Sequence, residues 1–318
     1  MRKIIYILIA ATFSVIVTRA EEYEPLVADA TYLYAEKDSS LLYMDIYEPA
    51  EGSETAIDGI EKPTVLFMFG GGFKNGQRDD GYFNKWFRSM TEAGYRIVSI
   101  DYRLGLAGFS GAGINMKFIR ALEAAIDLAV EDLYSATNFI IDNSEALGID
   151  PANIVVSGSS AGAISVMQGE WEICNSSENA KVLPAGFNYA GVMSFSGAVF
   201  SKKGAVRYTD EPCPVMMFHG TADKIVPYGK IQFFKLCFAG SGEIVKDFKK
   251  RNHSYAIYRC KDHSHEISAD MDFFTKEEFD FIENSVMKKL PTAIDVTVDN
   301  PDLPFPEWAK ENDFKALY

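Results

Sequence analysis

The stretch that decides the fold is Asn153-Ile-Val-Val-Ser-Gly-Ser-Ser-Ala-Gly162. Its β-branched run, residues 154–156, follows Pro151 and predicts a buried strand. The strand breaks into Gly-x-Ser-x-Gly, and residues 161–169 are compatible with a helix. A sharp strand-to-helix turn of this kind lifts one serine hydroxyl to the mouth of a parallel sheet. The pattern therefore predicts a nucleophile elbow with Ser160 as the reactive residue.

The same pentapeptide also fits an ordinary turn between a strand and a helix. The surrounding sequence must therefore distinguish a nucleophile elbow from such a turn. In an elbow, small residues such as Gly158 and Gly162 let strand and helix approach closely. The helix N-terminus beside Ser160 would also place partial positive charge where negative charge develops during acyl transfer. The remaining parts of such a site can each be sought at an expected place.

Strands alternate with helices on both sides of the elbow. We expect two strands joined by the polar turn 37–40, which form an antiparallel hairpin at one sheet edge. The further expected strands are residues 64–69, 95–103, 191–196, 214–219 and 254–260, the last of the sheet. This alternation predicts an α/β fold, a doubly wound and mostly parallel sheet.

The helices are predicted from apolar spacing. Apolar residues recur at intervals of three and four from Ile119 to Leu133, and the helix continues to a C-cap at Gly148. The last helix begins at Thr275, where Glu278 completes a capping box. The tail after Pro291 is expected to be an irregular extension on the surface.

Length and charge narrow the class of protein. The chain has 318 residues, no internal repeat and no shift in composition, so residues 21–318 are expected to form a single domain. The net charge of −14 argues against nucleic-acid partners and against docking to anionic membranes.

The first twenty residues differ from the rest. Arg2 and Lys3 precede an apolar run from Ile4 to Val17, and Thr18-Arg-Ala20 supplies small residues at a cleavage site. This pattern predicts a signal peptide at 1–20 and a secreted or periplasmic protein. The alternative is a membrane anchor, for which the run is shorter than the ~20 residues a span needs. We expect no stable membrane insertion after cleavage.

Four cysteines, at positions 174, 213, 237 and 260, leave two possibilities open. An exported chain can pair them in three ways, and buried free thiols fit equally well. Their spacing matches no zinc-binding pattern.

A serine nucleophile needs donors for the oxyanion, and glycines after an early strand can supply them. Gly70-Gly-Gly72 directly follows the apolar strand that ends at Phe69. Without a Cβ, such residues can turn their amides towards a substrate. We expect the amides of Gly71, Gly72 and Ala161 to form the oxyanion hole, although a plain glycine turn is the alternative.

The acid and the base are expected after later strands. Asp223 follows the strand that ends at His219, although a turn aspartate with no role is the alternative. Asp262-His-Ser-His-Glu266 follows the last expected strand, so His263 and His265 are both candidate bases. We favour His265 because it leaves a longer loop to reach over the sheet edge.

The two remaining histidines suit the role less well. His219 lies at a strand end beside the acid and is expected to be structural, and His253 lies at the wrong end of its strand. The His-x-His-Glu cluster also suggests a metal site, but no second ligand cluster supports it. A phosphate-binding loop at Gly70 is disfavoured because no Gly-Lys-Ser/Thr follows.

Taken together, these segments resemble the α/β-hydrolase superfamily, on the esterase/lipase branch that has a His-Gly-Gly-Gly oxyanion motif. The matching segments are Phe69-Gly-Gly-Gly-Phe73, Asp101-Tyr-Arg-Leu104, Gly148-Ile-Asp-Pro-Ala-Asn-Ile154, Gly158-Ser-Ser-Ala-Gly162 and His219-Gly-Thr-Ala-Asp-Lys-Ile-Val-Pro227. They spread over residues 64–290. Phe69 departs from the family, which has histidine there, so we expect packing to hold the loop.

The resemblance implies a serine carboxylic-ester hydrolase that uses a Ser160–His265–Asp223 triad and needs no metal or organic cofactor. The segments 169–191 and 196–214 are too short for a multi-helix lid. We therefore expect an open site for small-molecule or polysaccharide-linked esters, with short acyl groups or acetyl and feruloyl groups. The alternatives are a serine peptidase of the same fold and a non-catalytic binding protein on a hydrolase scaffold.

Overall fold

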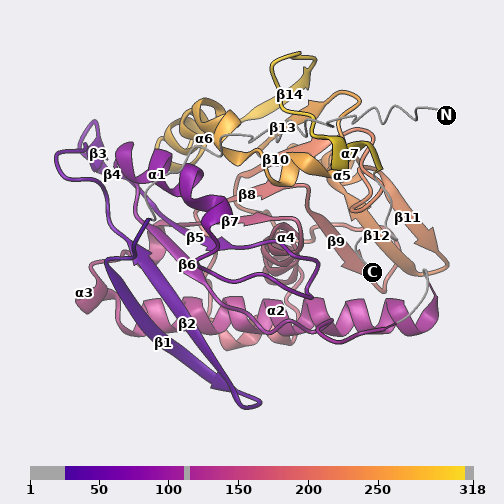
Figure 1. Ribbon diagram of the computed structural model, residues 1–318, viewed down its shortest axis with the longest axis horizontal. Coiled ribbons are helices and arrows are strands. Elements are labelled where there is room, and N and C mark those ends of the chain that lie inside the picture. The colour runs from indigo at the N-terminus through magenta and orange to yellow at the C-terminus, as the bar shows by residue number, and fades with distance from the viewer. Residues whose placement is uncertain (1–25, 111–114, 312–318) are drawn as a thin grey trace, which may run out of the picture.

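Apolar runs of the sequence form a nine-stranded sheet that organises the molecule (Figure 1). The computed structural model describes residues 26–110 and 115–311, so the expected signal peptide at 1–20 lies outside them. The sheet order is β1-β2-β6-β5-β7-β8-β10-β13-β14, and the seven strands from β6 to β14 in that order are parallel. Its strands are β1 (Ala30–Lys37), β2 (Ser40–Tyr47), β5 (Thr64–Met68), β6 (Ile97–Ile100), β7 (Ile154–Ser159), β8 (Gly191–Phe195), β10 (Val215–Gly220), β13 (Tyr255–Cys260) and β14 (Ala293–Val298).

The predicted hairpin is confirmed: β1 and β2 pair antiparallel, and β1 lies at one edge of the sheet. The expected doubly wound, mostly parallel sheet is confirmed as well. Every residue of the central strands β5, β7 and β10 is buried. Continuous burial of this kind is expected when helices cover both faces of a parallel sheet.

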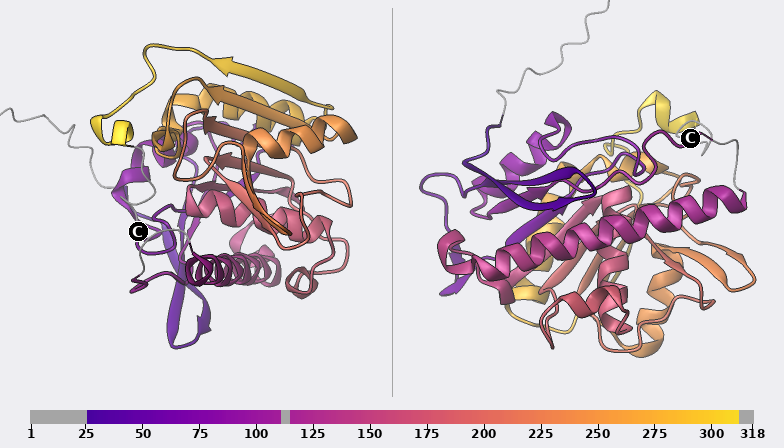
Figure 2. Two further views of the ribbon diagram at one scale, coloured as in Figure 1. Left: turned by 90° about the vertical axis from the view of Figure 1, so that its right-hand side faces the viewer. Right: turned by 90° about the horizontal axis from the view of Figure 1, so that it is seen from below.

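Helices form a layer on each face of the sheet (Figure 2). The long helix α2 (Met116–Asp142) packs against α4 (Ala161–Cys174) on one face. On the other face, α1 (Asn84–Glu92) packs against α6 (Thr275–Phe281). There the ring of Phe67 in β5 lies 4.8 to 5.2 Å from three aromatic rings, those of Phe83, Trp86 and Phe87. The remaining helices are α3 (Ser144–Leu147), α5 (Ser241–Arg251) and α7 (Glu307–Glu311).

A small second sheet was not anticipated from the sequence. It has the order β11-β12-β9 and consists of β11 (Lys230–Phe233), β12 (Leu236–Gly240) and β9 (Ala198–Ser201). All its pairings are antiparallel. Residues 202–214 form neither helix nor strand, and residues 175–190 contain only the 3₁₀ turn Asn179–Val182. The absence of a large lid is therefore confirmed for this part of the chain. A further short hairpin pairs β3 (Ala56–Ile57) with β4 (Ile60–Glu61).

Two expectations about the C-terminal part are wrong. The tail after Pro291 is not irregular throughout, because β14 pairs in parallel with β13 as the ninth strand. Its side chains are largely exposed, so it lacks the apolar run that marks the central strands. Thr275 is not a helix cap either. A 3₁₀ turn runs directly into α6, so Thr275 already has helical backbone angles and the cap position is Phe274.

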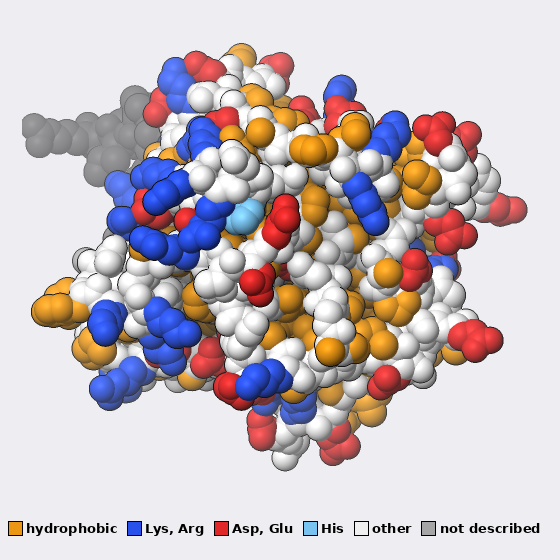
Figure 3. Space-filling model, turned by 180° about the vertical axis from the view of Figure 1, so that it is seen from behind, with side chains coloured by type: hydrophobic (Ala, Val, Ile, Leu, Met, Phe, Trp, Pro, Cys, Tyr) orange, Lys and Arg blue, Asp and Glu red, His pale blue; other side chains and the backbone are white. Residues whose placement is uncertain are grey.

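All four cysteines are buried free thiols, which rules out a disulfide among them in this structure. Among the described residues, no helix is long and apolar enough to span a membrane. Lysine and arginine side chains lie among aspartate and glutamate on the face shown in Figure 3.

Candidate active site

The carboxyl ends of the parallel strands β5, β7, β10 and β13 lie at one edge of the sheet. The chain leaves β5 into the glycine run, β7 into Ser160, β10 into the loop of Asp223, and β13 into the loop of His265. Parallel strands all end on the same side, so residues up to two hundred positions apart converge there. The four loops together form one site at this edge of the sheet.

Ser160 occupies a strained turn between β7 and α4. Its φ and ψ are 50° and −112°, which a non-glycine residue rarely adopts. The tight turn depends on two glycines. A Cβ on Gly162 would lie 2.0 Å from the Met68 carbonyl oxygen, and a Cβ on Gly158 would lie 2.4 Å from the backbone of Gly162. Strand and helix thus approach as closely as the pattern predicts.

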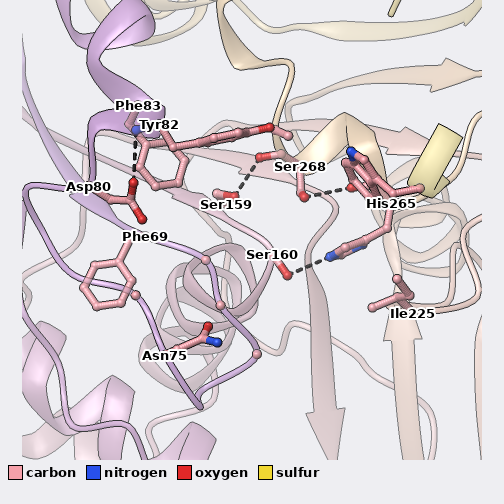
Figure 4. Close-up of a pocket in the computed structure, with 16 residues that line it drawn as sticks. Phe69, Asn75, Asp80, Tyr82, Phe83, Ser159, Ser160, Ile225, His265 and Ser268 are labelled. Atoms are coloured by element: carbon pink, nitrogen blue, oxygen red, sulfur yellow. Dashed lines mark hydrogen bonds between the residues drawn. The ribbon is translucent and has the colours of Figure 1, made fainter. Parts of the chain in front are cut away.

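A chain of hydrogen bonds joins three of the predicted residues, and Figure 4 shows its first link, from Ser160 to His265. The Ser160 Oγ lies 2.7 Å from Nε2 of His265. The other ring nitrogen, Nδ1, lies 2.8 Å from Oδ2 of Asp223. An ionised carboxylate only accepts hydrogen bonds, so Nδ1 carries the ring proton and Nε2 accepts from the serine hydroxyl. The ring is therefore oriented to take the hydroxyl proton.

The Asp223 carboxylate is buried and fully hydrogen-bonded. Its Oδ1 accepts the amides of Ile225 and Val226 at 2.8 and 3.0 Å. Its Oδ2 also lies 3.4 Å from Nε2 of His219. Burial opposes ionisation of Asp223, but the imidazoles of His265 and His219 more than offset it and hold the pKa well below its usual range. The carboxylate therefore stays charged beside the imidazole.

His219 is a structural residue, as its position predicts. Its Nε2 lies 3.0 Å from the Val226 carbonyl oxygen, and its Nδ1 lies 2.9 Å from the Ser241 hydroxyl. A carbonyl only accepts, so Nε2 is the protonated nitrogen. The ring braces the loop that carries Asp223.

His263 lies two positions before His265 in the chain, but its ring contacts Glu266 and not Ser160. Its Nδ1 lies 2.8 Å from Oε1 of Glu266. The buried Glu266 carboxylate also accepts the Ser264 amide with both oxygens. The structure thus places His265, and not His263, beside Ser160.

Several residues that the sequence reasoning did not single out hold these loops together. The Ala222 amide donates to the His263 carbonyl at 2.9 Å, which joins the loop of the acid to the loop of the base. A Cβ on Gly220 would lie 2.1 Å from the Ser264 carbonyl oxygen, so only glycine allows this approach. Gly220 was visible in the sequence, but the close contact of the two loops was not.

Two serines tie the elbow to the histidine loop. The Ser159 hydroxyl donates to the Ser268 carbonyl at 2.6 Å, and the Ser268 hydroxyl donates to the His265 carbonyl at 2.7 Å. Hydroxyls in such positions carry no recognisable sequence pattern, because their partners lie more than one hundred residues away or depend on a local 3₁₀ turn.

The glycine run lies directly against the nucleophile. A Cβ on Gly70 would lie 3.3 Å from the Ser160 Cβ. Gly71 and Gly72 have φ values of 111° and 63°, which favour glycine. Ala161 is the first residue of α4, and the first amides of a helix have no partner within it.

Phe69, at the position where the α/β-hydrolase esterases have histidine, is held by packing. Its ring is buried and stacks on Tyr102 with the ring centroids 4.4 Å apart. The Tyr102 hydroxyl donates to the Phe69 carbonyl at 2.9 Å. The start of the glycine run is thus held by an aromatic stack and by the Tyr102 hydroxyl, which also lies 3.5 Å from the Gly70 carbonyl oxygen.

A pocket of about 460 Å³ opens over Ser160 and His265. Asn75 and Asp80 supply polar groups to its wall, and Tyr82 and Trp308 line it as half-exposed aromatic residues. One Asp80 oxygen accepts the Tyr82 amide and so fixes the carboxylate in place (Figure 4). Among residues 26–110 and 115–311, no three His, Cys, Asp or Glu side chains are arranged to hold a metal ion.

Comparison with known proteins finds similarity to esterases and lipases. Residues 44–199 match the family model described as BD-FAE. Carboxylesterase 5A of Felis catus is 33% identical over 138 residues, 42% of this chain and 22% of its own length. Secreted lipase 1 of Botryotinia fuckeliana (strain B05.10) is 28% identical over 177 residues, 54% of this chain and 27% of its own length. The matched segments span about a quarter of the length of each of these two relatives.

Among solved structures, the apo form of Thermogutta terrifontis esterase 2 is similar over most of both chains. The match has a TM-score of 0.57 and 17% identity, and it covers 86% of this chain and 98% of the other. At this identity the likeness establishes the fold.

Proposed function

We propose that this chain, a member of the α/β-hydrolase superfamily on its esterase/lipase branch, is a carboxylesterase-type serine hydrolase that acts through Ser160, His265 and Asp223. The observation that carries the proposal is the continuous hydrogen-bond chain from the Ser160 hydroxyl through the imidazole to the buried carboxylate. A serine hydroxyl is a weak nucleophile until a base removes its proton, and this arrangement supplies one.

In the proposed reaction, Ser160 Oγ attacks the ester carbonyl while its proton passes to Nε2 of His265. The imidazolium is stabilised by Asp223, which holds Nδ1–H. His265 then returns the proton to the leaving alkoxide, and the C–O bond of the ester breaks. Water, deprotonated by His265, then attacks the acyl carbonyl carbon. The bond between this carbon and Ser160 Oγ breaks, the imidazolium returns the proton to Ser160, and the acid leaves.

Negative charge on the carbonyl oxygen needs donors near Ser160. The amides of Gly71, Gly72 and Ala161 are the proposed donors, since both glycines and the first residue of α4 adjoin the nucleophile. The positive end of the α4 dipole acts in the same direction.

The proposed substrates are short-acyl esters or acetyl and feruloyl esters of a carbohydrate. The pocket is open, and residues 26–110 and 115–311 form no large lid over it, which suits a bulky alcohol group. Asn75 and Asp80 offer hydrogen-bond partners for hydroxyl groups, and Tyr82 and Trp308 offer apolar faces.

The decisive test uses a fluorophosphonate probe on a matched pair of variants. Ser160→Ala should lose labelling, and the neighbouring Ser159→Ala should keep it. Hydrolysis of p-nitrophenyl acetate should fall about 10⁴-fold or more in Ser160→Ala, by analogy with other triads. Labelling that survives in Ser160→Ala would refute the assignment of the nucleophile.

Substrate class is tested with p-nitrophenyl esters beside acetylated xylan. Acetyl and butyryl esters should be hydrolysed with higher kcat/KM than dodecanoyl and palmitoyl esters. The reverse order would refute the short-acyl proposal. Peptide hydrolysis without ester hydrolysis would favour a peptidase, and no turnover or labelling would favour a binding protein.

Export is proposed from the first twenty residues, whose pattern is that of a signal peptide. The mass of the protein recovered outside the cytoplasm should correspond to cleavage after Ala20. A full-length protein retained in the membrane fraction would contradict this.

A further inference from the structure

A second, apolar depression lies beside the candidate active site. It is a groove of about 100 Å³ between the N-terminal part of α2, the small β11-β12-β9 sheet and the loop that follows Asp223. Eleven of its twelve lining residues are apolar or cysteine, and Lys224 is the charged one. We refer to it as the Ile225 groove.

The groove leaves large apolar side chains in contact with water. Ile231 and Phe233 of β11 are 51% and 62% exposed, and both line it. The adjoining Phe234 is 84% exposed. Apolar side chains project at the left edge of Figure 3, where the hairpin of β11 and β12 lies. Single exposed apolar residues need no explanation, but a contiguous apolar groove indicates a binding site.

Ile225 connects this groove to the reacting groups. It lines the pocket over Ser160 and His265, and it also lines the groove. Its amide donates to the Asp223 carboxylate at 2.8 Å, so its position is fixed relative to the triad. In Figure 4 the Ile225 side chain lies beside the His265 ring, at the rim of the pocket. A chain attached to a carbonyl at Ser160 thus reaches the groove by passing over one side chain.

The two depressions differ in chemistry. The pocket wall carries Asn75 and Asp80, which suit hydroxyl groups, whereas the groove offers almost only hydrocarbon surface. An ester has two sides, and the two depressions share Ile225, whose side chain lies beside the His265 ring. This continuity argues for a part of the substrate as the occupant of the groove.

We propose that the Ile225 groove binds a hydrocarbon chain of the ester substrate and thereby sets the preference for chain length. The inference rests on the proposed esterase function. The chain belongs either to the acyl group or to the alcohol group, and both have the same apolar chemistry. Burial of one methylene is worth about 0.8 kcal/mol, or about a fourfold gain in kcat/KM.

The test fills the groove from the side of α2. Leu122 lines it, and Leu122→Trp should block it, whereas Ala124→Trp on the exposed face of the same helix is the matched control. One arm compares p-nitrophenyl hexanoate with p-nitrophenyl acetate. The other arm compares hexyl acetate with methyl acetate.

In Leu122→Trp, the ratio of kcat/KM for the longer over the shorter ester should fall at least tenfold in one arm, while the shorter ester stays within about threefold of wild type. The arm that responds identifies the side of the ester that occupies the groove. Ala124→Trp should change neither ratio. Ile231→Trp fills the groove from the exposed strand β11 and should reproduce the fall if Leu122→Trp does not fold.

Two results would overturn the inference. Unchanged ratios in both arms with a folded variant would show that no chain enters the groove. A dimer that dissociates in Phe233→Ser, measured by sedimentation, would show that a second copy of the chain covers it. Failure of the esterase proposal itself is separate, because the wild-type protein would then hydrolyse none of these esters and would not react with the fluorophosphonate.

Discussion

Replacing Asp223 by asparagine removes one charge from the centre of the candidate triad with almost no change in volume. The carboxylate lies 2.8 Å from Nδ1 of His265, and the Asp223 side chain is fully buried. Asparagine can still accept the amide bonds of Ile225 and Val226, so the loop should remain in place. The amide can also present its NH₂ group to Nδ1, which favours the tautomer with the proton on Nε2.

The magnitude follows from the charge pair that forms during the reaction. Two unit charges 2.8 Å apart attract each other by about 6 kcal/mol at an effective dielectric constant of about 20. Each 1.36 kcal/mol corresponds to a factor of ten in rate. We therefore expect kcat for p-nitrophenyl acetate to fall on the order of 10⁴-fold in Asp223→Asn.

The assay measures kcat and KM at pH 7 to 8 together with the unfolding midpoint of each variant. Asp270→Asn is the control, since it makes the same replacement of a carboxyl by an amide and no contact between Asp270 and His265 is described. A KM within a few-fold of wild type would show that substrate binding is preserved. A folded Asp223→Asn protein that retains more than a tenth of the wild-type kcat would refute the reasoning.

Three further predictions concern stability, measured by urea unfolding. Gly162→Ala should cost at least about 3 kcal/mol, because its Cβ would lie 2.0 Å from the Met68 carbonyl oxygen, whereas a Cβ on the control Gly229→Ala has no neighbour within 4 Å. Burial and nearby carboxylates raise the pKa of Asp270 to about 7, so the native state binds the proton more tightly than the unfolded state and loses stability as the pH rises from about 4 to 7. Asp270→Asn should therefore flatten that profile and gain roughly 1–2 kcal/mol at pH 8, after discounting for partial exposure; an unchanged profile would contradict this. Burial raises the pKa of Glu278 well above its usual range, so the wild type loses stability as the pH rises above about 4, and Glu278→Gln should be nearly as stable as wild type at pH 4 and more stable at pH 8; an equal difference at both pH values would argue against a protonated side chain.

Features that depend on neighbours in the chain were predictable from the sequence. Continuous apolar runs marked the buried strands, and the hairpin of β1 and β2 followed from two such runs around a polar turn. The elbow around Ser160 was equally local, because the glycines and the serine that the turn requires lie within five residues. The position of Asp223 followed from a rule of topology, that active residues follow the carboxyl ends of parallel strands.

Features that depend on contacts between distant segments were decided only by the tertiary structure. The sequence contains two candidate bases, His263 and His265, two positions apart. A turn fixed by the buried Glu266 directs the His265 ring to Ser160 and the His263 ring to the Glu266 carboxylate. Strand β14 forms because its backbone pairs with β13, although its exposed side chains carry no apolar run. The small sheet and the Ile225 groove likewise exist because β9 meets the β11–β12 hairpin. A hydrogen bond or an apolar contact acts over a few ångströms of space, and the spacing of residues along the chain does not record which segments come that close.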